Sequence, residues 1–400
     1  MRSAFSKPRL ARLSAKFADY VDRGQVPGLV VLLARDDEVH VEVHGKLARD
    51  GDAPMQRDSL FRIASLTKPI AAAAAMTFVE EGRIGLDDPV APWLPELSEP
   101  KVLRARDAQV DDVVPAERAI TLRDLLTFRL GHGAIMAPPG AYPIQAAQAA
   151  AGLAPGPDIP TLAPDEYMRR LGELPLQHQP GAAWRYHTGA DVLGVLLARL
   201  AGRPLEAVLH ERVLEPLGMA DTGFHVDTAR RPRLTTAYVA DPESGDLSVF
   251  APAETGAFVE PPLFPSAGGG LVSTADDLLA FSRMMLGLGR AGRTRVLSRA
   301  AVELMTRDHV TPHQKAASPF APGFWDAEGW GFGLSVVTRC ETIGPSVGSY
   351  GWFGGYGTSW RADPKEGVTV ILLTQRLMAG PDDARITEDF WTLAYQALDD

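Results

Sequence analysis

The stretch FRIASLTKP, residues 61–69, carries the pattern from which the fold and chemistry of this chain can be worked out. An alanine-rich run over residues 66–81 follows Ser65 and Gly82 can end it, so we expect Ser65 at the start of a helix. Positions i and i+3 share one face of a helix, which lets the Lys68 amine reach the Ser65 hydroxyl. Serine becomes a strong nucleophile when a neighbour takes its proton, and a lysine with a lowered pKa can do so. The stretch therefore predicts a nucleophilic serine beside a basic lysine.

Two other serines fit catalytic patterns but lie in poor surroundings. The sequence SEPK, residues 98–101, repeats the Ser-x-x-Lys spacing, yet Pro100 and the turn-like flanks argue against a helix there. Ser346 fits the Gly-x-Ser-x-Gly pattern of α/β-hydrolases, which requires a following helix and a later histidine. Residues 349–355 predict no helix, and the last histidine, His313, precedes Ser346. Ser65 is therefore the predicted nucleophile.

Further segments match one known family in the same order. Residues 61–69 resemble the nucleophile segment of the class C β-lactamase and penicillin-binding-protein-like serine hydrolases, and are closest to the family VIII carboxylesterases. Residues 120–127, 215–222 and 267–277 resemble three more blocks of that family. The similarity extends over about residues 20–395, nearly the whole chain.

The resemblance implies a second catalytic motif around Tyr186. Where the family has Tyr-x-Asn, this chain reads Tyr186-His187-Thr188. The family pattern places the Tyr186 phenol between Ser65 and Lys68, so that Lys68 and Tyr186 serve as general base and acid. We expect His187 and Thr188 to contact the substrate. Thr188 has no amide with which to hold the side-chain amide of a lactam.

The third family motif departs from that of the β-lactamases. Instead of Lys-Thr-Gly or His-Thr-Gly, a predicted strand carries Trp352, Phe353, Gly354 and Gly355, and the esterases of the family have Trp-x-Gly there. The resemblance implies that the Gly355 N–H pairs with that of Ser65 as an oxyanion hole. The aromatic pair would form an apolar wall for the substrate, with Gly354 leaving room for it.

Strand patterns occur near both ends of the chain, with helical patterns between them. The predicted strands are residues 28–35, 39–43, 331–337, 357–362 and 367–373, besides the segment of the third motif. We predict an α+β fold of the β-lactamase/transpeptidase type, with an antiparallel sheet of five or more strands flanked by helices at 8–22 and 384–398. Residues 1–85 and 232–400 would form the domain with the sheet, residues 86–231 a mostly helical domain, and Ser65 would lie between them.

Composition excludes several other functions. The formal net charge is -10 and the charges are interspersed, so we expect no nucleic-acid partner. Residues 1–12 lack the apolar core of a secretory signal, and no window reaches the roughly 18 apolar residues of a membrane span, so we expect a cytoplasmic protein without a membrane partner. Cys340 is the one cysteine, which excludes an internal disulfide, and we expect it to be buried. The histidines lack metal-ligand spacing, so we expect neither metal nor cofactor.

The function that these features favour is hydrolysis of a small carboxylic ester through an acyl-enzyme on Ser65. The same residues would serve a β-lactamase, a D-amino-acid peptidase or amidase, or an acyltransferase. A penicillin-binding receptor that is acylated and never turns over is a further alternative. The third motif, Thr188 and the missing export signal favour the esterase.

Overall fold

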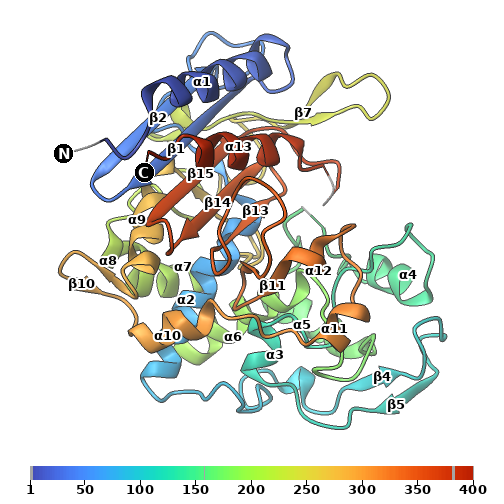
Figure 1. Ribbon diagram of the computed structural model, residues 1–400. Helices are drawn as coiled ribbons and strands as arrows, with labels where there is room; N and C mark the ends of the chain where they lie inside the picture. Colours follow the sequence, from blue (N-terminus) through green and yellow to red (C-terminus); the bar gives the residue numbers. More distant parts are fainter. Residues whose placement is uncertain (1–2, 157, 381–382, 400) are drawn as a thin grey trace.

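The computed structural model describes residues 3–156, 158–380 and 383–399. Its centre is a seven-stranded sheet in which every neighbouring pair is antiparallel. The strands, in spatial order, are β11 (Glu328–Trp330), β12 (Ser335–Val337), β13 (Tyr350–Gly354), β14 (Thr358–Asp363), β15 (Val368–Thr374), β1 (Gly28–Arg35) and β2 (Glu38–Gly45). The first and last parts of the chain thus share one sheet, as expected (Figure 1).

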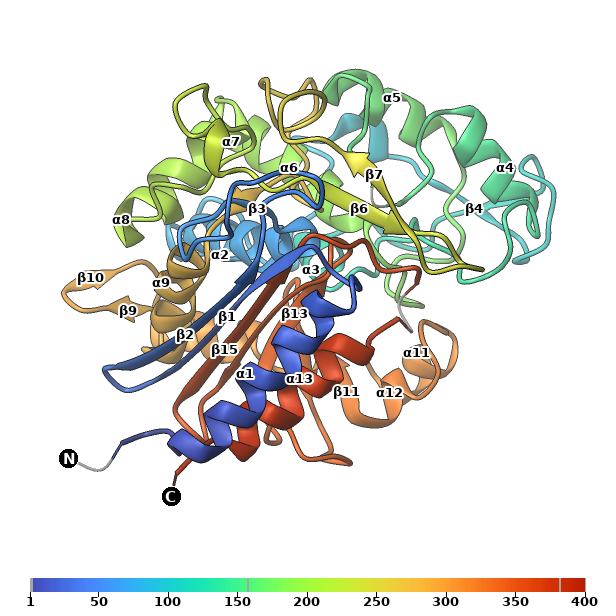
Figure 2. The same ribbon diagram turned by 90° about the horizontal axis from the view of Figure 1, so that it is seen from above.

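Helices cover both faces of this sheet. Helices α1 (Lys7–Asp22) and α13 (Arg385–Gln396) lie side by side on one face (Figure 2). Their buried side chains, such as Phe17 and Phe390, pack against alternate residues of β1 and β15. The remaining residues of these strands face the main core with α2 (Thr67–Glu80) and α9 (Ala275–Leu286). Because both faces are covered, β1 reads as a continuous apolar run without alternation.

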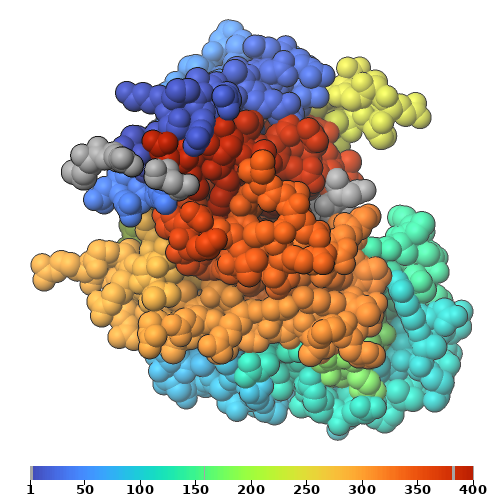
Figure 3. Space-filling view, viewed as in Figure 1, coloured from blue at the N-terminus to red at the C-terminus, as the bar shows by residue number. Residues whose placement is uncertain are grey.

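The middle of the chain is mostly helical and lies at the other end of the molecule (Figure 3). It contains α3 (Leu122–Leu126), α4 (Pro143–Ala150), α5 (Pro164–Glu173), α6 (Thr188–Ala201), α7 (Leu205–Leu209) and α8 (Glu215–Leu217), with one small hairpin of β4 (Lys101–Leu103) and β5 (Val113–Pro115). Helix α2 packs among these helices and the sheet in a single hydrophobic core.

Several shorter strands and helices belong to the same part of the chain as the sheet. They are β3 (Phe61–Arg62) paired with β8 (Val272–Ser273), β6 (Ala237–Ala240) with β7 (Leu247–Ala251), β9 (Arg290–Ala291) with β10 (Thr294–Arg295), and the helices α10 (Arg299–Met305), α11 (Pro312–Ala316) and α12 (Phe324–Ala327).

Two expectations from the sequence need correction. The predicted strand 331–337 is a strand only from Ser335, as β12, because Gly333 has a positive φ of 70° and a Cβ atom there would lie 2.9 Å from the carbonyl oxygen of Lys68. Cys340 is exposed, since it lies on the loop between β12 and β13, where its thiol donates to the carbonyl of Pro345.

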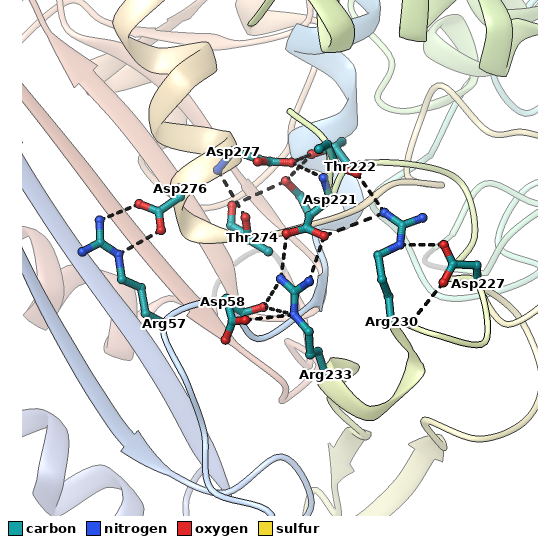
Figure 4. Close-up of polar contacts among 12 residues, drawn as sticks. Arg57, Asp58, Asp221, Thr222, Asp227, Arg230, Arg233, Thr274, Asp276 and Asp277 are labelled. Carbon is teal, nitrogen blue, oxygen red and sulfur yellow. Dashed lines mark hydrogen bonds and ion pairs between the residues drawn. The ribbon is translucent and has the colours of Figure 1, made fainter. Parts of the chain in front are cut away.

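An ion-pair network joins the segment before the nucleophile to two distant blocks of the chain (Figure 4). Arg57 pairs with Asp276 in the first turn of α9, at 2.7 Å. Arg233 donates to the carboxylate of Asp221 at 2.7 Å and to the carbonyl of Asp58 at 2.6 Å. These contacts hold residues 215–222 and 267–277, two of the family-like blocks, against the chain that leads into Ser65.

Asp277 is the buried centre of this network. Its carboxylate accepts hydrogen bonds from the Thr222 hydroxyl at 2.8 Å and from the backbone N–H of Asp221 at 2.9 Å. Burial raises the pKa of Asp277 to about 6, although these hydrogen bonds oppose the shift. Asp277 therefore stabilises this junction by hydrogen bonding, at a distance from Ser65.

No helix in the described part of the chain has both the length and the apolar character needed to cross a bilayer.

Candidate active site

Ser65 lies on a 3₁₀ turn, Ala64–Leu66, that leads directly into α2. Ala64 has a φ of 45°, an uncommon conformation for a residue with a Cβ atom. Thr67 holds this turn, because its hydroxyl donates to the Ala64 carbonyl at 2.7 Å and accepts from the Leu271 N–H at 3.2 Å. The strained turn leaves Ser65 partly exposed while its neighbours are buried.

Lys68 lies one turn after Ser65 and is 1% exposed. Its Nζ donates to Ser65 Oγ at 2.8 Å and to the carbonyl oxygen of Gly268 at 2.5 Å. Burial lowers the pKa of Lys68 to about 7, and the negative charge of Asp191 acts in the opposite direction. A lysine with such a pKa is partly neutral at pH 7 and can accept the Ser65 proton.

Tyr186 precedes α6 and stands beside the same two residues. The Lys68 Nζ lies 4.6 Å from the centre of the Tyr186 ring, and the Tyr186 hydroxyl accepts a hydrogen bond from Trp352 Nε1 at 2.6 Å. Burial raises the pKa of Tyr186, while hydrogen bonds with Ser65 and Trp352 oppose the rise. Tyr186 is therefore neutral at pH 7 and is suited to donate a proton.

His187 and Asp191 form a second polar pair behind Lys68. His187 Nε2 lies 3.0 Å from Asp191 Oδ2, and His187 Nδ1 lies 3.4 Å from Lys68 Nζ. Asp191 is 1% exposed, and its other oxygen accepts from the Ser266 hydroxyl and from the Gly268 N–H. Although burial would raise the pKa of Asp191, the neighbouring His187, with which it is hydrogen-bonded, and the Ser266 hydroxyl lower it.

Asp191 was not among the site residues predicted from the sequence. A signal was present, because Asp191 follows His187 by one helical turn in an otherwise apolar helix start, and positions i and i+4 of a helix are neighbours. A charged residue in such a run needs a partner when it is buried.

The end of β13 packs directly against the segment that carries Ser65. A Cβ atom at Gly354 would lie 2.4 Å from the Ile63 carbonyl oxygen and 3.2 Å from the Cβ of Ala64, so only glycine fits there. This close approach places Gly355 beside Ser65, and both residues line the same cavity. Ser65 and Gly355 therefore border the same space, although they are 290 residues apart in the sequence.

The cavity above Ser65 has a volume of about 300 Å³ and mostly apolar walls. Side chains from distant parts of the chain contribute to it, namely Ala134, Met136, Pro155, Phe320, Phe353 and Met378. The described residues that line it include no lysine, arginine, aspartate or glutamate. The cavity is therefore suited to an uncharged, apolar group attached to the reacting carbonyl.

The residues expected at the substrate occupy different places. Phe353, Tyr186 and His187 line the cavity. Trp352 is 1% exposed behind Tyr186, and Thr188 is 1% exposed in the first turn of α6, so neither is among the residues that line the cavity. Gly354 lies beneath the cavity against Ile63.

Among the described residues, neither of the two other serines is hydrogen-bonded to a lysine as Ser65 is. Ser98 is exposed at the end of a short 3₁₀ turn. Ser346 is bonded to Glu366 through its hydroxyl and to Asp363 through its N–H. Among residues 3–156, 158–380 and 383–399, no three His, Cys, Asp or Glu side chains are grouped as metal ligands.

The Beta-lactamase family model matches residues 13–390. Protein Rv1367c of Mycobacterium tuberculosis is 41% identical over 369 residues, which cover 90% of this chain and 88% of that protein. Esterase EstB of Burkholderia gladioli is 33% identical and the match covers 93% of this chain and 92% of EstB. The solved structure of EstCE1, a hydrolase with promiscuous acyltransferase activity, is 28% identical with a TM-score of 0.80, over 97% of this chain and 99% of EstCE1.

Proposed function

Because this chain belongs to the beta-lactamase family, we propose that it is a serine hydrolase that cleaves carboxylic esters through an acyl-enzyme on Ser65. The observation that carries the proposal is the 2.8 Å hydrogen bond between Ser65 and a buried Lys68 at the base of an apolar cavity. The likeness to esterase EstB supports an ester substrate.

In the proposed reaction, Ser65 Oγ attacks the ester carbonyl carbon while its proton passes to Lys68 Nζ. The carbonyl oxygen becomes an oxyanion, for which the N–H groups of Ser65 and Gly355 are the donors. When the tetrahedral intermediate collapses, the bond to the alkoxy oxygen breaks. The alcohol leaves with a proton from the Tyr186 hydroxyl, which Lys68 then replaces.

A water molecule completes the cycle. It attacks the acyl carbon, Lys68 takes one of its protons, and the acid is released as Ser65 regains its hydrogen. The roles of Lys68 and Tyr186 differ because burial acts in opposite senses on the two groups. It lowers the pKa of the lysine and raises that of the tyrosine.

The lining of the cavity favours an ester over a β-lactam. A lactam carries a carboxylate that needs a positively charged or polar partner, and the described lining residues include no cation. Loss of such a contact removes the positioning on which fast acylation depends. An ester with an aliphatic acyl group requires only the apolar walls.

The test is a panel of p-nitrophenyl esters beside a chromogenic cephalosporin. We expect steady turnover of short-chain esters and far slower turnover of the cephalosporin. Ser65→Ala should abolish ester hydrolysis, whereas Ser98→Ala and Ser346→Ala, the matched controls, should leave it largely intact. Near-normal turnover by Ser65→Ala contradicts the proposal, and a single burst without turnover identifies the non-turning-over receptor instead.

Acyl transfer to an alcohol is a second candidate, because EstCE1 is described as a hydrolase with promiscuous acyltransferase activity. An alcohol would replace water in the attack on the same acyl-enzyme. Adding a primary alcohol to the ester assay and measuring the transesterified product separates transfer from hydrolysis.

A further inference from the structure

The amine of Lys68 has three close polar neighbours. They are Ser65 Oγ at 2.8 Å, the Gly268 carbonyl oxygen at 2.5 Å and His187 Nδ1 at 3.4 Å. A neutral amine has two N–H bonds and one lone pair, and catalysis requires that the lone pair faces the Ser65 hydroxyl. Which neighbours accept and which donate therefore decides whether Lys68 can act as a base.

Asp191 determines the donor pattern of His187. The Asp191 carboxylate can only accept, so His187 Nε2, at 3.0 Å, carries the proton and donates to it. The carboxylate itself is held by the Ser266 hydroxyl at 2.6 Å and the Gly268 N–H at 3.1 Å. With the proton on Nε2, His187 Nδ1 presents a lone pair to Lys68.

We propose that His187 and Asp191 are positioning residues that aim the lone pair of Lys68 at Ser65. Gly268 and His187 Nδ1 only accept, so they take both N–H bonds of the neutral amine, and the lone pair is left for the Ser65 hydroxyl. After the proton moves from Ser65 Oγ to Lys68 Nζ, the ammonium has three N–H bonds and the same three neighbours accept them. This inference rests on the proposed function in taking Lys68 as the base for Ser65.

The backbone is arranged to keep this imidazole in place. His187 has a φ of 81°, a conformation that is unfavourable for a residue with a side chain. A Cβ atom at Gly268 would lie 2.9 Å from both His187 Nε2 and Asp191 Oδ1, so the neighbouring chain leaves room for the pair only because it has glycine. These two features hold the ring between Lys68 and Asp191.

Few other ionisable groups act on these residues. Tyr186, His187 and Asp191 are the ionisable side chains that face Lys68 among those described. Tyr167, another described residue, also has its pKa raised by the charge of Asp191, although burial is the larger cause. A substitution of Asp191 therefore acts on the site chiefly through His187 and Lys68.

Asp191→Asn tests the inference with little change in shape. The amide oxygen can keep the hydrogen bonds of Ser266 and Gly268, while the amide nitrogen donates to His187 Nε2. The proton then moves to Nδ1, which points a donor at Lys68 and draws its lone pair away from Ser65. We expect at least a tenfold fall both in the labelling rate of Ser65 by a fluorophosphonate and in kcat/KM for an ester.

The pH profile separates this role from a purely structural one. The labelling rate of Ser65 rises with pH as Lys68 loses its proton. Removing the negative charge of Asp191 moves this rise to lower pH, because that charge raises the pKa of Lys68. Loosened packing would instead admit water around Lys68 and move the rise in labelling rate to higher pH. Asp277 is a buried acid outside the site, so Asp277→Asn is the matched control. It should leave the rise in labelling rate at the wild-type pH.

His187→Gly provides a second variant should Asp191→Asn fail to fold, since glycine accepts a positive φ. We expect slower labelling that added imidazole partly restores. If either folded variant is labelled at the wild-type rate and with the wild-type dependence on pH, the inference is overturned. Failure of the wild-type protein itself to label Ser65 would instead overturn the proposed function.

Discussion

Trp352, on β13, donates a hydrogen bond from its indole Nε1 to the hydroxyl oxygen of Tyr186 at 2.6 Å. Because the Tyr186 oxygen accepts from this side, its own proton is directed elsewhere, and Ser65 is the other partner of that hydroxyl. The aromatic residue of the third motif thus acts on Tyr186 from behind, while its neighbour Phe353 faces the cavity.

Trp352→Phe should slow alkyl esters more than p-nitrophenyl esters. The variant removes the indole donor and leaves the Tyr186 proton free to turn away from the leaving group. An alkoxide must be protonated as it leaves, whereas p-nitrophenolate is stable without a proton. We expect kcat/KM for an ethyl ester to fall about tenfold, and Tyr186→Phe to reduce it by roughly 10²–10⁴. Equal losses for both leaving groups would contradict this role of Trp352.

Ester hydrolysis should rise with pH through about 7, the value to which burial lowers the pKa of Lys68. Below that pH the amine is protonated and cannot accept the Ser65 proton, so kcat/KM falls about tenfold per pH unit. Above it the rate levels off. Lys68→Arg should be inactive at every pH because a guanidinium stays charged. A flat profile from pH 5 to 8 would exclude Lys68 as the base.

Lys68→Met should stabilise the protein while abolishing activity. The pKa of Lys68 is about 7 when folded and near 10.5 when unfolded, so between these values the unfolded chain binds more protons. The wild-type free energy of unfolding therefore gains up to about 1.4 kcal/mol per pH unit from this group as the pH rises. We expect the variant to be more stable by roughly 2–4 kcal/mol at pH 7, and by less at pH 9. Urea unfolding at both pH values measures the difference.

Phe353→Ala should shift the preferred acyl chain to a longer one. Phe353 and Met378 line both the cavity above Ser65 and a second cavity of about 290 Å³ between α12 and α13. Removing the ring joins the two spaces, and a longer chain then fills them with apolar contacts. Phe324→Ala, which enlarges only the second cavity, is the control and should leave the preference unchanged. Chain-length profiles with C2 to C12 p-nitrophenyl esters provide the comparison.

The antiparallel α+β fold could be predicted because its signals are local or follow from the order of segments. Ser65 and Lys68 are three residues apart at a helix start, so their contact needs no tertiary information. The strands at both chain ends are visible as apolar runs, and a sheet that joins them follows from their distribution. The places of Tyr186 and the third motif in the site were predicted from the resemblance to a family. Their distance to Ser65 along the chain carries no geometric information.

Tertiary packing decided which atoms face one another in the site. Trp352 and Phe353 are adjacent in sequence and their rings stack with centroids 4.2 Å apart, yet only Phe353 lines the cavity above Ser65. Trp352 is enclosed by Tyr186 and Phe324, which come from distant parts of the chain. Asp191 is buried because Gly268 and Ser266, from a distant segment of the chain, enclose it and donate hydrogen bonds to its carboxylate. The sequence alone determined the contact between Ser65 and Lys68, because one helical turn brings the two residues together. The direction of the lysine lone pair depends on segments more than 100 residues apart, and only the folded chain brings those into contact.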